Sequence, residues 1–207
     1  MSPTFVDRAP DRGKYDRKLS PTERVAQQRL RVLLATAEVA AVHGVEGLTL
    51  SRVAARAHVG RNTFYLHFDD LASALGAAEA LGMSELGDGL ETSLHLARTP
   101  VEQLRGIARA WLDLMDRLPT LARASLRPSL RSGESALSPA GRLLCDRLNE
   151  VVSEARSGGT FSIGADPARL VACSASLEAI AKSYLDRRVA RDDAAALFVD
   201  LVVRIFR

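Results

Sequence analysis

The sequence predicts an all-α protein of about nine helices, and three features support this fold class. Alanine, leucine and arginine are abundant, whereas runs of Val, Ile and Thr are scarce, so no β-strands are expected. Apolar residues recur at helical spacing along most of the chain. Several predicted helices also begin with a capping residue followed by proline, at Ser20-Pro21, Thr99-Pro100, Ser138-Pro139 and Asp166-Pro167.

The chain begins with an irregular segment and a long helix. Residues 1–20 carry prolines, a glycine and mixed charges without a periodic apolar pattern, so a flexible basic arm is predicted there. Such an arm can reach the minor groove of DNA or have no role, and both alternatives stay open. A helix is then expected from about residue 24 to residue 43, with one apolar face between Leu30 and Ala41.

Residues 48–68 form the most informative stretch of the chain. Thr49 suits the N-cap of a short helix over residues 51–57, and a break at residues 58–60 precedes a second short helix over residues 61–68. Two short helices joined by such a turn form a helix-turn-helix, whose second helix can reach into the major groove of DNA. The chain is therefore predicted to bind double-stranded DNA.

The side chains at the start of the second helix suit base recognition. Arg61 matches guanine, Asn62 matches adenine, and Thr63 suits a thymine methyl group or a phosphate. Tyr65 and His67 can each donate a hydrogen bond to a phosphate, with the alternative that one of them packs under the helix. The predicted DNA-binding residues are Thr49, Ser51, Arg52, Arg61, Asn62, Thr63, Tyr65 and His67.

Two further features of this region bear on the same prediction. Phe64 and Phe68 are expected in the core, whereas an exposed Arg52 needs no functional explanation. Residues 1–68 carry 11 Lys and Arg against 6 Asp and Glu, whereas residues 69–207 carry 17 against 19. Positive charge is thus concentrated where the helix-turn-helix is predicted, as binding to phosphates requires.

The helix-turn-helix resembles the DNA-binding domain of TetR-type transcriptional repressors. The resemblance covers about residues 28–75 and rests on the order of Leu48-Thr49, Val53-Ala54, Ala57, Val59, Thr63, Tyr65 and His67-Phe68. It implies that Tyr65 and His67 lie at the DNA backbone. It also implies a DNA-binding domain over residues 21–70 and an effector-binding and dimerisation domain over residues 71–207.

The sequence departs from the family pattern at three positions. His58 stands where the family usually has glycine, so it is expected in a left-handed backbone conformation. Gly60 stands where serine or threonine is usual, so no side-chain oxygen caps the second helix. Leu71 replaces a common lysine and follows Asp69 and Asp70, which lowers the expected affinity for DNA.

The rest of the chain predicts further helices. A glycine-rich helix capped by Asp70 is expected to about Leu96, followed by helices from residue 100 to about 118 and from 139 to about 151. Pro119 ends the second of these or starts a short helix to Ser125, and residues 127–138 are predicted to be a loop. The last two helices, about residues 166–187 and 192–206, resemble the family's dimer-forming pair. The predicted interface residues are Leu177, Ala181, Tyr184, Leu197, Phe198, Leu201, Val202 and Ile205.

An effector pocket among these helices is implied by the resemblance. Trp111 and Met115 could line it, or simply fill the core. The predicted pocket residues are Leu86, Ile107, Trp111, Met115, Leu144, Leu148, Cys173 and Leu177.

Several classes of function find no support in the sequence. The four histidines are scattered without metal-ligand spacing, and no nucleophile or phosphate-loop motif is present, so no enzyme activity, metal or cofactor is expected. No membrane span or export signal is predicted, which favours a cytoplasmic protein with reduced thiols. Cys145 and Cys173 are interpreted as small core residues, with a redox switch as the alternative.

The sequence therefore predicts a one-component transcriptional regulator. It would bind a palindromic operator as a homodimer and be released by a small-molecule effector. Repression is the family's usual mode, and activation stays open. The alternatives are a sequence-tolerant architectural DNA-binding protein without an effector, and a helical protein that binds small molecules.

Overall fold

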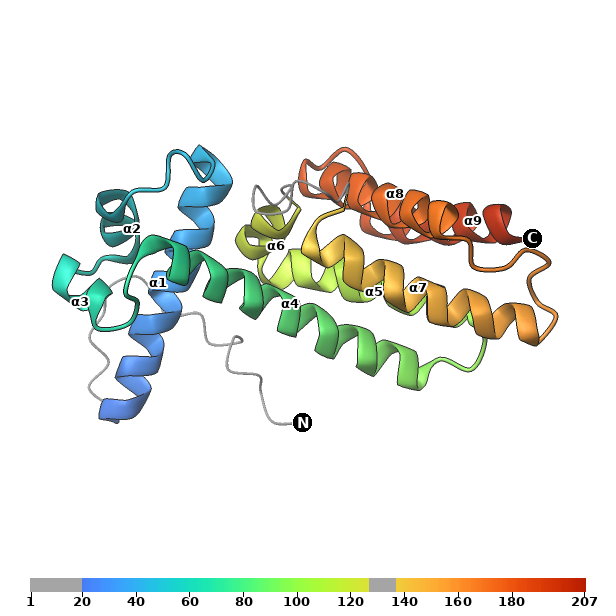
Figure 1. The fold of residues 1–207 in the computed structure, drawn as a ribbon, viewed down its shortest axis with the longest axis horizontal. Coiled ribbons are helices and arrows are strands. Elements are labelled where there is room, and N and C mark those ends of the chain that lie inside the picture. The colour runs from blue at the N-terminus through green and yellow to red at the C-terminus, as the bar shows by residue number, and fades with distance from the viewer. Residues whose placement is uncertain (1–19, 127–136) are drawn as a thin grey trace. The chain divides into compact units, whose positions relative to one another are not determined.

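The computed structural model describes residues 20–126 and 137–207, and within these residues it contains nine α-helices and no β-strand (Figure 1). This confirms the predicted all-α class. The predicted arm apart from Ser20, and residues 127–136 of the predicted loop, lie outside the described residues. The helices are α1 (Pro21–His43), α2 (Leu50–Ala57), α3 (Arg61–Tyr65), α4 (Leu71–Leu96), α5 (Pro100–Arg117), α6 (Pro119–Ser125), α7 (Pro139–Ser157), α8 (Pro167–Leu185) and α9 (Arg191–Phe206).

The predicted helix starts are confirmed by their capping contacts. Ser20 and Glu23 form a reciprocal capping box at α1, with the Glu23 amide 3.2 Å from Ser20 Oγ and the Ser20 amide 2.7 Å from a Glu23 carboxylate oxygen. Thr99 and Glu102 repeat this arrangement at α5. In both helices a proline occupies the first turn, where its missing N–H costs no hydrogen bond.

The described residues fall into two compact units that divide within α4. The N-terminal unit ends at Leu81 and the C-terminal unit begins at Gly82. In the N-terminal unit α2 packs against α1 and α3 packs against α2. The core between these helices holds Leu33, Val53 and Phe64, all buried. This packing supports the two short helices, since neither α2 nor α3 is long enough to be stable alone in water.

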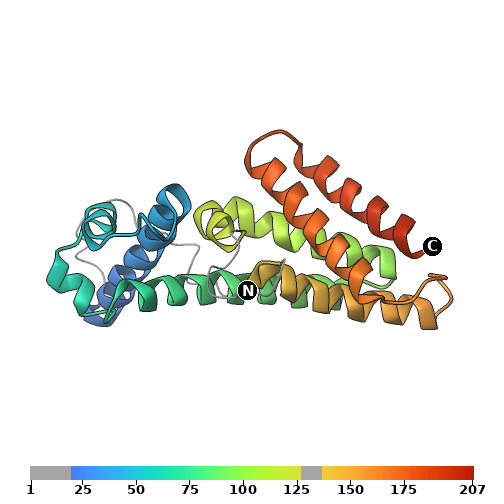
Figure 2. The same ribbon diagram turned by 45° about the horizontal axis from the view of Figure 1, so that its top comes forward.

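The C-terminal unit is a helical bundle arranged around α5. This helix contacts α6, α7, α8 and α9, and its buried face includes Leu104, Ile107 and Trp111. Gly106 permits α5 to approach α4, because a Cβ atom at Gly106 would lie 3.0 Å from the Cβ atom of Ser93. The last two helices, α8 and α9, lie side by side and run in opposite directions (Figure 1, Figure 2).

Candidate nucleic-acid interface

The turn between α2 and α3 is built as the sequence predicts. Thr49 caps α2, with its hydroxyl accepting a hydrogen bond from the Arg52 amide at 3.4 Å. His58 ends α2 in the left-handed conformation, at φ 54° and ψ 46°. Gly60 precedes α3 without a side-chain capping bond. The expectations for Thr49, His58 and Gly60 are thus confirmed, and α3 begins at Arg61.

The second helix is shorter than predicted. It ends at Tyr65, whereas the sequence predicted a helix to Phe68. The carbonyl of Phe64 accepts hydrogen bonds from the amides of both His67 (2.9 Å) and Phe68 (3.0 Å). This shared acceptor tightens the last turn, and Leu66 and His67 form a turn rather than a regular helix.

The side chains of α3 divide sharply into buried and exposed. Phe64 is 0% exposed and Phe68 is also buried, which confirms both as core residues. Their ring centroids lie 5.9 Å apart. Tyr65 is 57% exposed. Its ring nevertheless makes an edge-to-face contact with the ring of Phe64, at a centroid distance of 5.6 Å. The buried phenylalanines therefore fix the helix while its other face stays available.

That available face carries the side chains predicted to read bases. Arg61 and Asn62 are exposed, and Thr63 is half-buried. Leu66, which the sequence interpretation passed over, is 79% exposed. It lies four residues after Asn62, so the two belong to one face of the helix and its terminal turn. That spacing is the signal by which Leu66 could have been found.

Three arginines of the helix-turn-helix have different partners. Arg61 Nη2 donates to the hydroxyl of Ser51 at 3.1 Å, which joins α3 to α2. Arg52 Nη1 donates to the carbonyl oxygen of Gly47 at 2.6 Å. The guanidinium of Arg56 lies 2.6 Å from the Glu38 carboxylate and ties α2 to α1. Only the last of these contacts neutralises the charge of its arginine.

His67 lies partly under the helix. Its Nε2 atom is 3.4 Å from the side-chain oxygen of Gln28 on α1. Burial, and secondly the positive charge of Arg29, lower the pKa of His67 from its usual value of 6.5. The Arg29 guanidinium in turn lies 5.0 Å from the centroid of the Phe68 ring. His67 is therefore a neutral imidazole near pH 7, able to donate one N–H.

Of the two acidic residues before α4, Asp69 and Asp70, the second has a structural role. A carboxylate oxygen of Asp70 accepts a hydrogen bond from the Ser73 amide at 2.6 Å, which confirms Asp70 as the predicted cap. The Ser73 hydroxyl accepts from the Asp70 amide at 3.2 Å. Leu71, at the position of the family's lysine, is half-buried and offers no charge to a phosphate.

The predicted effector-pocket residues all lie in the interior of the C-terminal unit. They come from α4, α5, α7 and α8, and each is at most 2% exposed. The fully buried indole N–H of Trp111 has no hydrogen-bond partner among the described residues, whereas the fully buried hydroxyl of Ser174 interacts with Cys145. Buried donors are normally paired, so these groups mark the interior as polar at two points. Whether the eight residues bind an effector stays a prediction.

Burial also raises the pKa values of the two cysteine thiols. Burial, and secondly the nearby Cys145, raise the pKa of Cys173 to about 11. Burial likewise raises the pKa of Cys145, although Ser174 opposes the rise. Both are free thiols that stay protonated near neutral pH, which disfavours thiolate chemistry.

An open groove in the C-terminal unit is separate from that interior. It has a volume of about 830 Å³ and is lined by α4, α5 and α7, with the carboxylates of Glu91, Glu150 and Glu154 among its walls. None of the eight predicted pocket residues lines it. The charged side chains in its walls distinguish it from the apolar pocket that the resemblance implies.

The predicted dimer residues divide into two groups. Leu177, Ala181, Phe198 and Val202 are buried within the chain itself. Leu197 is 51% exposed, whereas Tyr184, Leu201 and Ile205 are half-buried. The interface stays a prediction, and a partner would meet the second group.

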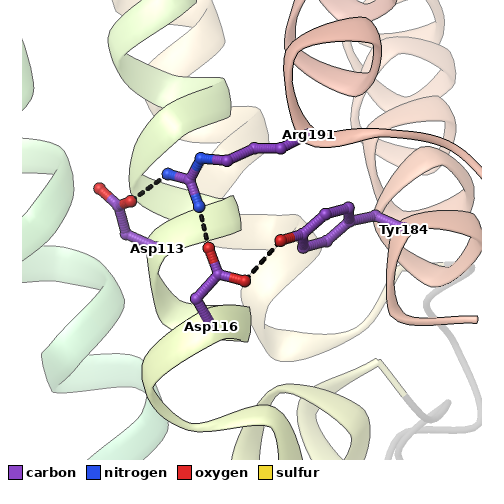
Figure 3. A network of polar contacts seen from close by, with 4 residues as sticks. All are labelled: Asp113, Asp116, Tyr184 and Arg191. Atoms are coloured by element: carbon purple, nitrogen blue, oxygen red, sulfur yellow. Dashed lines mark hydrogen bonds and ion pairs between the residues drawn. The ribbon is translucent and has the colours of Figure 1, made fainter. Parts of the chain in front are cut away.

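Tyr184 also belongs to a polar network that joins α5 to the junction of α8 and α9 (Figure 3). Its hydroxyl donates to the carboxylate of Asp116, which raises the pKa of Tyr184 above its usual value of 10.0. Arg191, the first residue of α9, donates to the carboxylates of both Asp113 and Asp116. This network fixes the start of α9 against α5.

Two searches of the described residues bear on other classes of site. Residues 20–126 and 137–207 contain no group of three or more His, Cys, Asp or Glu side chains placed to hold a metal ion. Within the same ranges, no helix has both the length and the apolar character needed to cross a lipid bilayer.

Comparison with known proteins relates the helix-turn-helix to a family of regulatory proteins. Residues 32–75 match the family model of the bacterial regulatory proteins of the tetR family. We found no significant match to the sequence among curated proteins.

Solved structures extend the comparison to the whole fold. A TetR-like transcriptional regulator from Rhodococcus sp. RHA1 is similar at a TM-score of 0.71 and 17% identity, over 86% of this chain and 95% of that chain. The fatty acid degradation regulator FadR from Bacillus halodurans has a TM-score of 0.69 at 18% identity, over 86% and 98%. AibR, solved in complex with isovaleryl coenzyme A and operator DNA, has a TM-score of 0.65 at 20% identity, over 83% and 96%.

At these identities the structural likeness establishes the fold, whereas the family match assigns the exposed helix-turn-helix. Residues 32–75 therefore carry a DNA-binding domain of the tetR-family type, and the chain has the fold of the TetR-like transcriptional regulator to which it is similar.

Proposed function

We propose that this protein is a homodimeric repressor that binds a palindromic operator and leaves it when a small-molecule effector binds. The observation that carries the proposal is the division of α3. Phe64 is fully buried and fixes the helix, while Arg61 and Asn62 stand exposed on it. A rigidly supported helix with exposed base-reading side chains is what insertion into a major groove requires.

The roles of the side chains follow from their chemistry. Arg61 would pair with guanine and Asn62 with adenine, while Thr63 would contact a thymine methyl group or a phosphate. Tyr65 is exposed and would donate its hydroxyl to a phosphate. The neutral His67 has one ring N–H, which faces the Gln28 side-chain oxygen, so His67 would donate to a phosphate by exchanging that contact. Leu66, on the same face as Asn62, would add an apolar contact to a thymine methyl group.

Dimerisation is supported by the outer faces of α8 and α9. Val171 on α8 is 38% exposed and Leu197 on α9 is 51% exposed. A second copy that packs on these faces about a two-fold axis would remove both side chains from water. It would also present two recognition helices to successive major grooves, about 34–36 Å apart, and so select an inverted repeat.

The effector site is proposed among the eight buried residues of α4, α5, α7 and α8. The unpaired indole N–H of Trp111 favours an effector with a hydrogen-bond acceptor. Cys173, the one titratable side chain of the eight, stays uncharged near pH 7, which favours an uncharged group at this point. The structure of AibR with both isovaleryl coenzyme A and operator DNA is a precedent for a ligand-responsive regulator on this fold.

Release from DNA would be a shift between two populations. An effector that binds better when the recognition helices are misplaced must weaken DNA binding by the same coupling free energy, typically about 1–3 kcal/mol. Because the proposed pocket residues also form the core, effector binding requires the core to open. That coupling links an interior site to the arrangement of the helices.

The proposal is tested by selecting duplexes from a randomised DNA pool with the purified full chain at near-physiological salt. Enrichment of an inverted repeat is expected, together with lost preference at one or two base pairs when Asn62→Ala is used. Retention of all duplexes, with steep salt dependence and no enriched sequence, would instead establish an architectural DNA-binding protein. No retention at all would contradict DNA binding and leave a helical small-molecule binding protein.

A further inference from the structure

The side chains of Ser51 and Arg61 form the one direct polar link described between the two helices of the helix-turn-helix, within residues 50–65. Arg61 Nη2 lies 3.1 Å from Ser51 Oγ, and both residues are exposed. Ser51 stands in the first turn of α2 and Arg61 is the first residue of α3. The contact therefore holds the Arg61 guanidinium beside α2 before any DNA is bound.

The nature of the acceptor decides what this contact can do. A hydroxyl oxygen is uncharged, so it takes one of the five guanidinium donors and leaves the full positive charge in place. Guanine needs two parallel donors for its O6 and N7 acceptors, and the remaining N–H groups of Arg61 supply them. A carboxylate at the same place would instead neutralise the group, as Glu38 does for Arg56.

Arg52 is held in a different way. Its Nη1 atom lies 2.6 Å from the backbone carbonyl oxygen of Gly47, in the turn that follows α1. Gly47 approaches the end of α1 closely, since a Cβ atom there would lie 2.6 Å from the carbonyl oxygen of His43. The Arg52 side chain thus stabilises the tight turn between α1 and α2, whereas the Arg61 side chain extends from α3 and is held against α2.

We propose that Ser51 is a positioning residue that holds Arg61 ready for guanine, and that Arg52 supports the turn before α2 without reading a base. The inference rests on the proposed operator binding and assigns specificity within it. Ordering the long Arg61 side chain in the free protein removes part of the entropy that binding would otherwise cost. Ser51 then contributes to discrimination between bases through Arg61 and not through a contact of its own.

A double-mutant cycle separates this role from a direct contact of Ser51 with a phosphate. The affinities of the full chain and of Ser51→Ala, Ser51→Thr, Arg61→Ala and Ser51→Ala/Arg61→Ala are measured on two duplexes. One duplex is the enriched operator, and the other has the Arg61-dependent guanine replaced in each half-site. Arg52→Ala is measured alongside, and Ser84→Ala, which changes an exposed serine of α4, is the matched control.

Ser51→Ala is expected to lower discrimination between the duplexes roughly 3- to 10-fold, the cost of ordering one long side chain. Ser51→Thr should restore it, because the hydroxyl is kept. In the Arg61→Ala background Ser51→Ala should have no further effect. Arg52→Ala should change the affinity for both duplexes by the same factor, and Ser84→Ala should change neither.

The contrary results are equally specific. If Ser51→Ala weakens binding to both duplexes equally, and does so in the Arg61→Ala background too, Ser51 contacts the DNA itself and the proposal is wrong. If Arg52→Ala loses discrimination at a particular base pair, Arg52 is a base reader. Unfolding curves of each variant exclude loss of folding as the cause. A wild-type chain that selects no operator would instead overturn the proposed function.

Discussion

The two units of the chain hold their proposed binding residues in opposite environments. In the N-terminal unit Arg61, Asn62 and Tyr65 are exposed on a helix that the buried rings of Phe64 and Phe68 fix from beneath. In the C-terminal unit Trp111 and its neighbours are themselves the core. DNA binding can therefore vary while the N-terminal core stays constant, whereas an effector site in the C-terminal unit cannot change without a change in stability.

In the N-terminal unit, the residues proposed to select DNA are therefore different from those that stabilise the fold. In the C-terminal unit, the residues proposed to bind the effector also stabilise the fold. Substitutions on the exposed face of α3 remove contacts with DNA at little cost to folding. Substitutions among the buried residues of α5, α7 and α8 leave cavities, which lower the free energy of unfolding even when no effector is bound. The following experiments sharpen or break this contrast, beginning with the largest expected effect.

Truncation of one buried side chain of the C-terminal unit and one exposed side chain of the N-terminal unit should give the largest difference in stability. Trp111→Ala is expected to destabilise the C-terminal unit by about 3–5 kcal/mol, because it leaves a large cavity in the core. Leu66→Ala should change the stability by no more than about 0.5 kcal/mol, since Leu66 is 79% exposed. Urea unfolding followed by far-ultraviolet circular dichroism measures both. Similar losses for the two variants would contradict the contrast.

A charge on the outer face of α9 should break the dimer while it spares the fold of the chain. Leu197→Asp places a carboxylate within the proposed interface, where burial would cost at least about 2 kcal/mol per dimer. The dissociation constant of the dimer should rise accordingly in sedimentation experiments. Asp200→Asn, which changes an exposed residue of the same helix without adding charge, is the control. An unchanged mass would place the interface elsewhere.

The turn of the helix-turn-helix should tolerate the family's usual glycine. His58 adopts φ 54°, which costs a residue with a Cβ atom about 1–2 kcal/mol. His58→Gly relieves this cost but adds entropy to the unfolded chain, so a net stabilisation of up to about 1 kcal/mol is expected. Thermal unfolding of the N-terminal unit checks the sign. A loss of stability would indicate that the His58 side chain makes a contact of its own.

The smallest effects concern pH, and here the two units should respond in opposite directions. Burial and Arg29 lower the pKa of His67, so the folded N-terminal unit binds its proton less readily than the unfolded chain does. The stability of that unit should therefore decrease as the pH falls below the usual value of 6.5.

Glu178 in the C-terminal unit has the opposite shift. Burial raises its pKa from the usual value of 4.5, although the Ser138 hydroxyl donates to its carboxylate. Its contribution is present below pH 4.5 and is lost as the pH rises through the folded pKa. His67→Gln and Glu178→Gln should each flatten the pH dependence of one unit. Trp111, the only tryptophan of the chain, reports on the C-terminal unit by its fluorescence.

The parts of the fold that local sequence determines were predictable, and those that depend on distant residues were not. Ser20, Thr49 and Asp70 cap helices as predicted because a cap needs only the next three residues. Phe64 and Phe68 are buried, as predicted. The early end of α3 was missed, because the shared carbonyl of Phe64 depends on where Phe68 must pack.

Contacts between side chains far apart in the sequence were beyond prediction for the same reason. The approach of His67 to Gln28 joins the turn after α3 to α1, between residues that are 39 positions apart in the sequence. The link from Arg61 to Ser51 depends on the angle between α2 and α3, which the spacing of residues does not specify. In the C-terminal unit the unpaired N–H of Trp111 reflects the packing of several helices at once.

The account's central claim is that exposed side chains of the N-terminal unit read an inverted repeat while the C-terminal unit pairs two chains. The most direct test is the native mass of the complex between the full chain and the selected duplex, compared with the same measurement for Leu197→Asp. The account predicts an even number of wild-type chains on each inverted repeat, and single chains bound weakly to half-sites for the variant. One wild-type chain bound to each duplex with full affinity would contradict it.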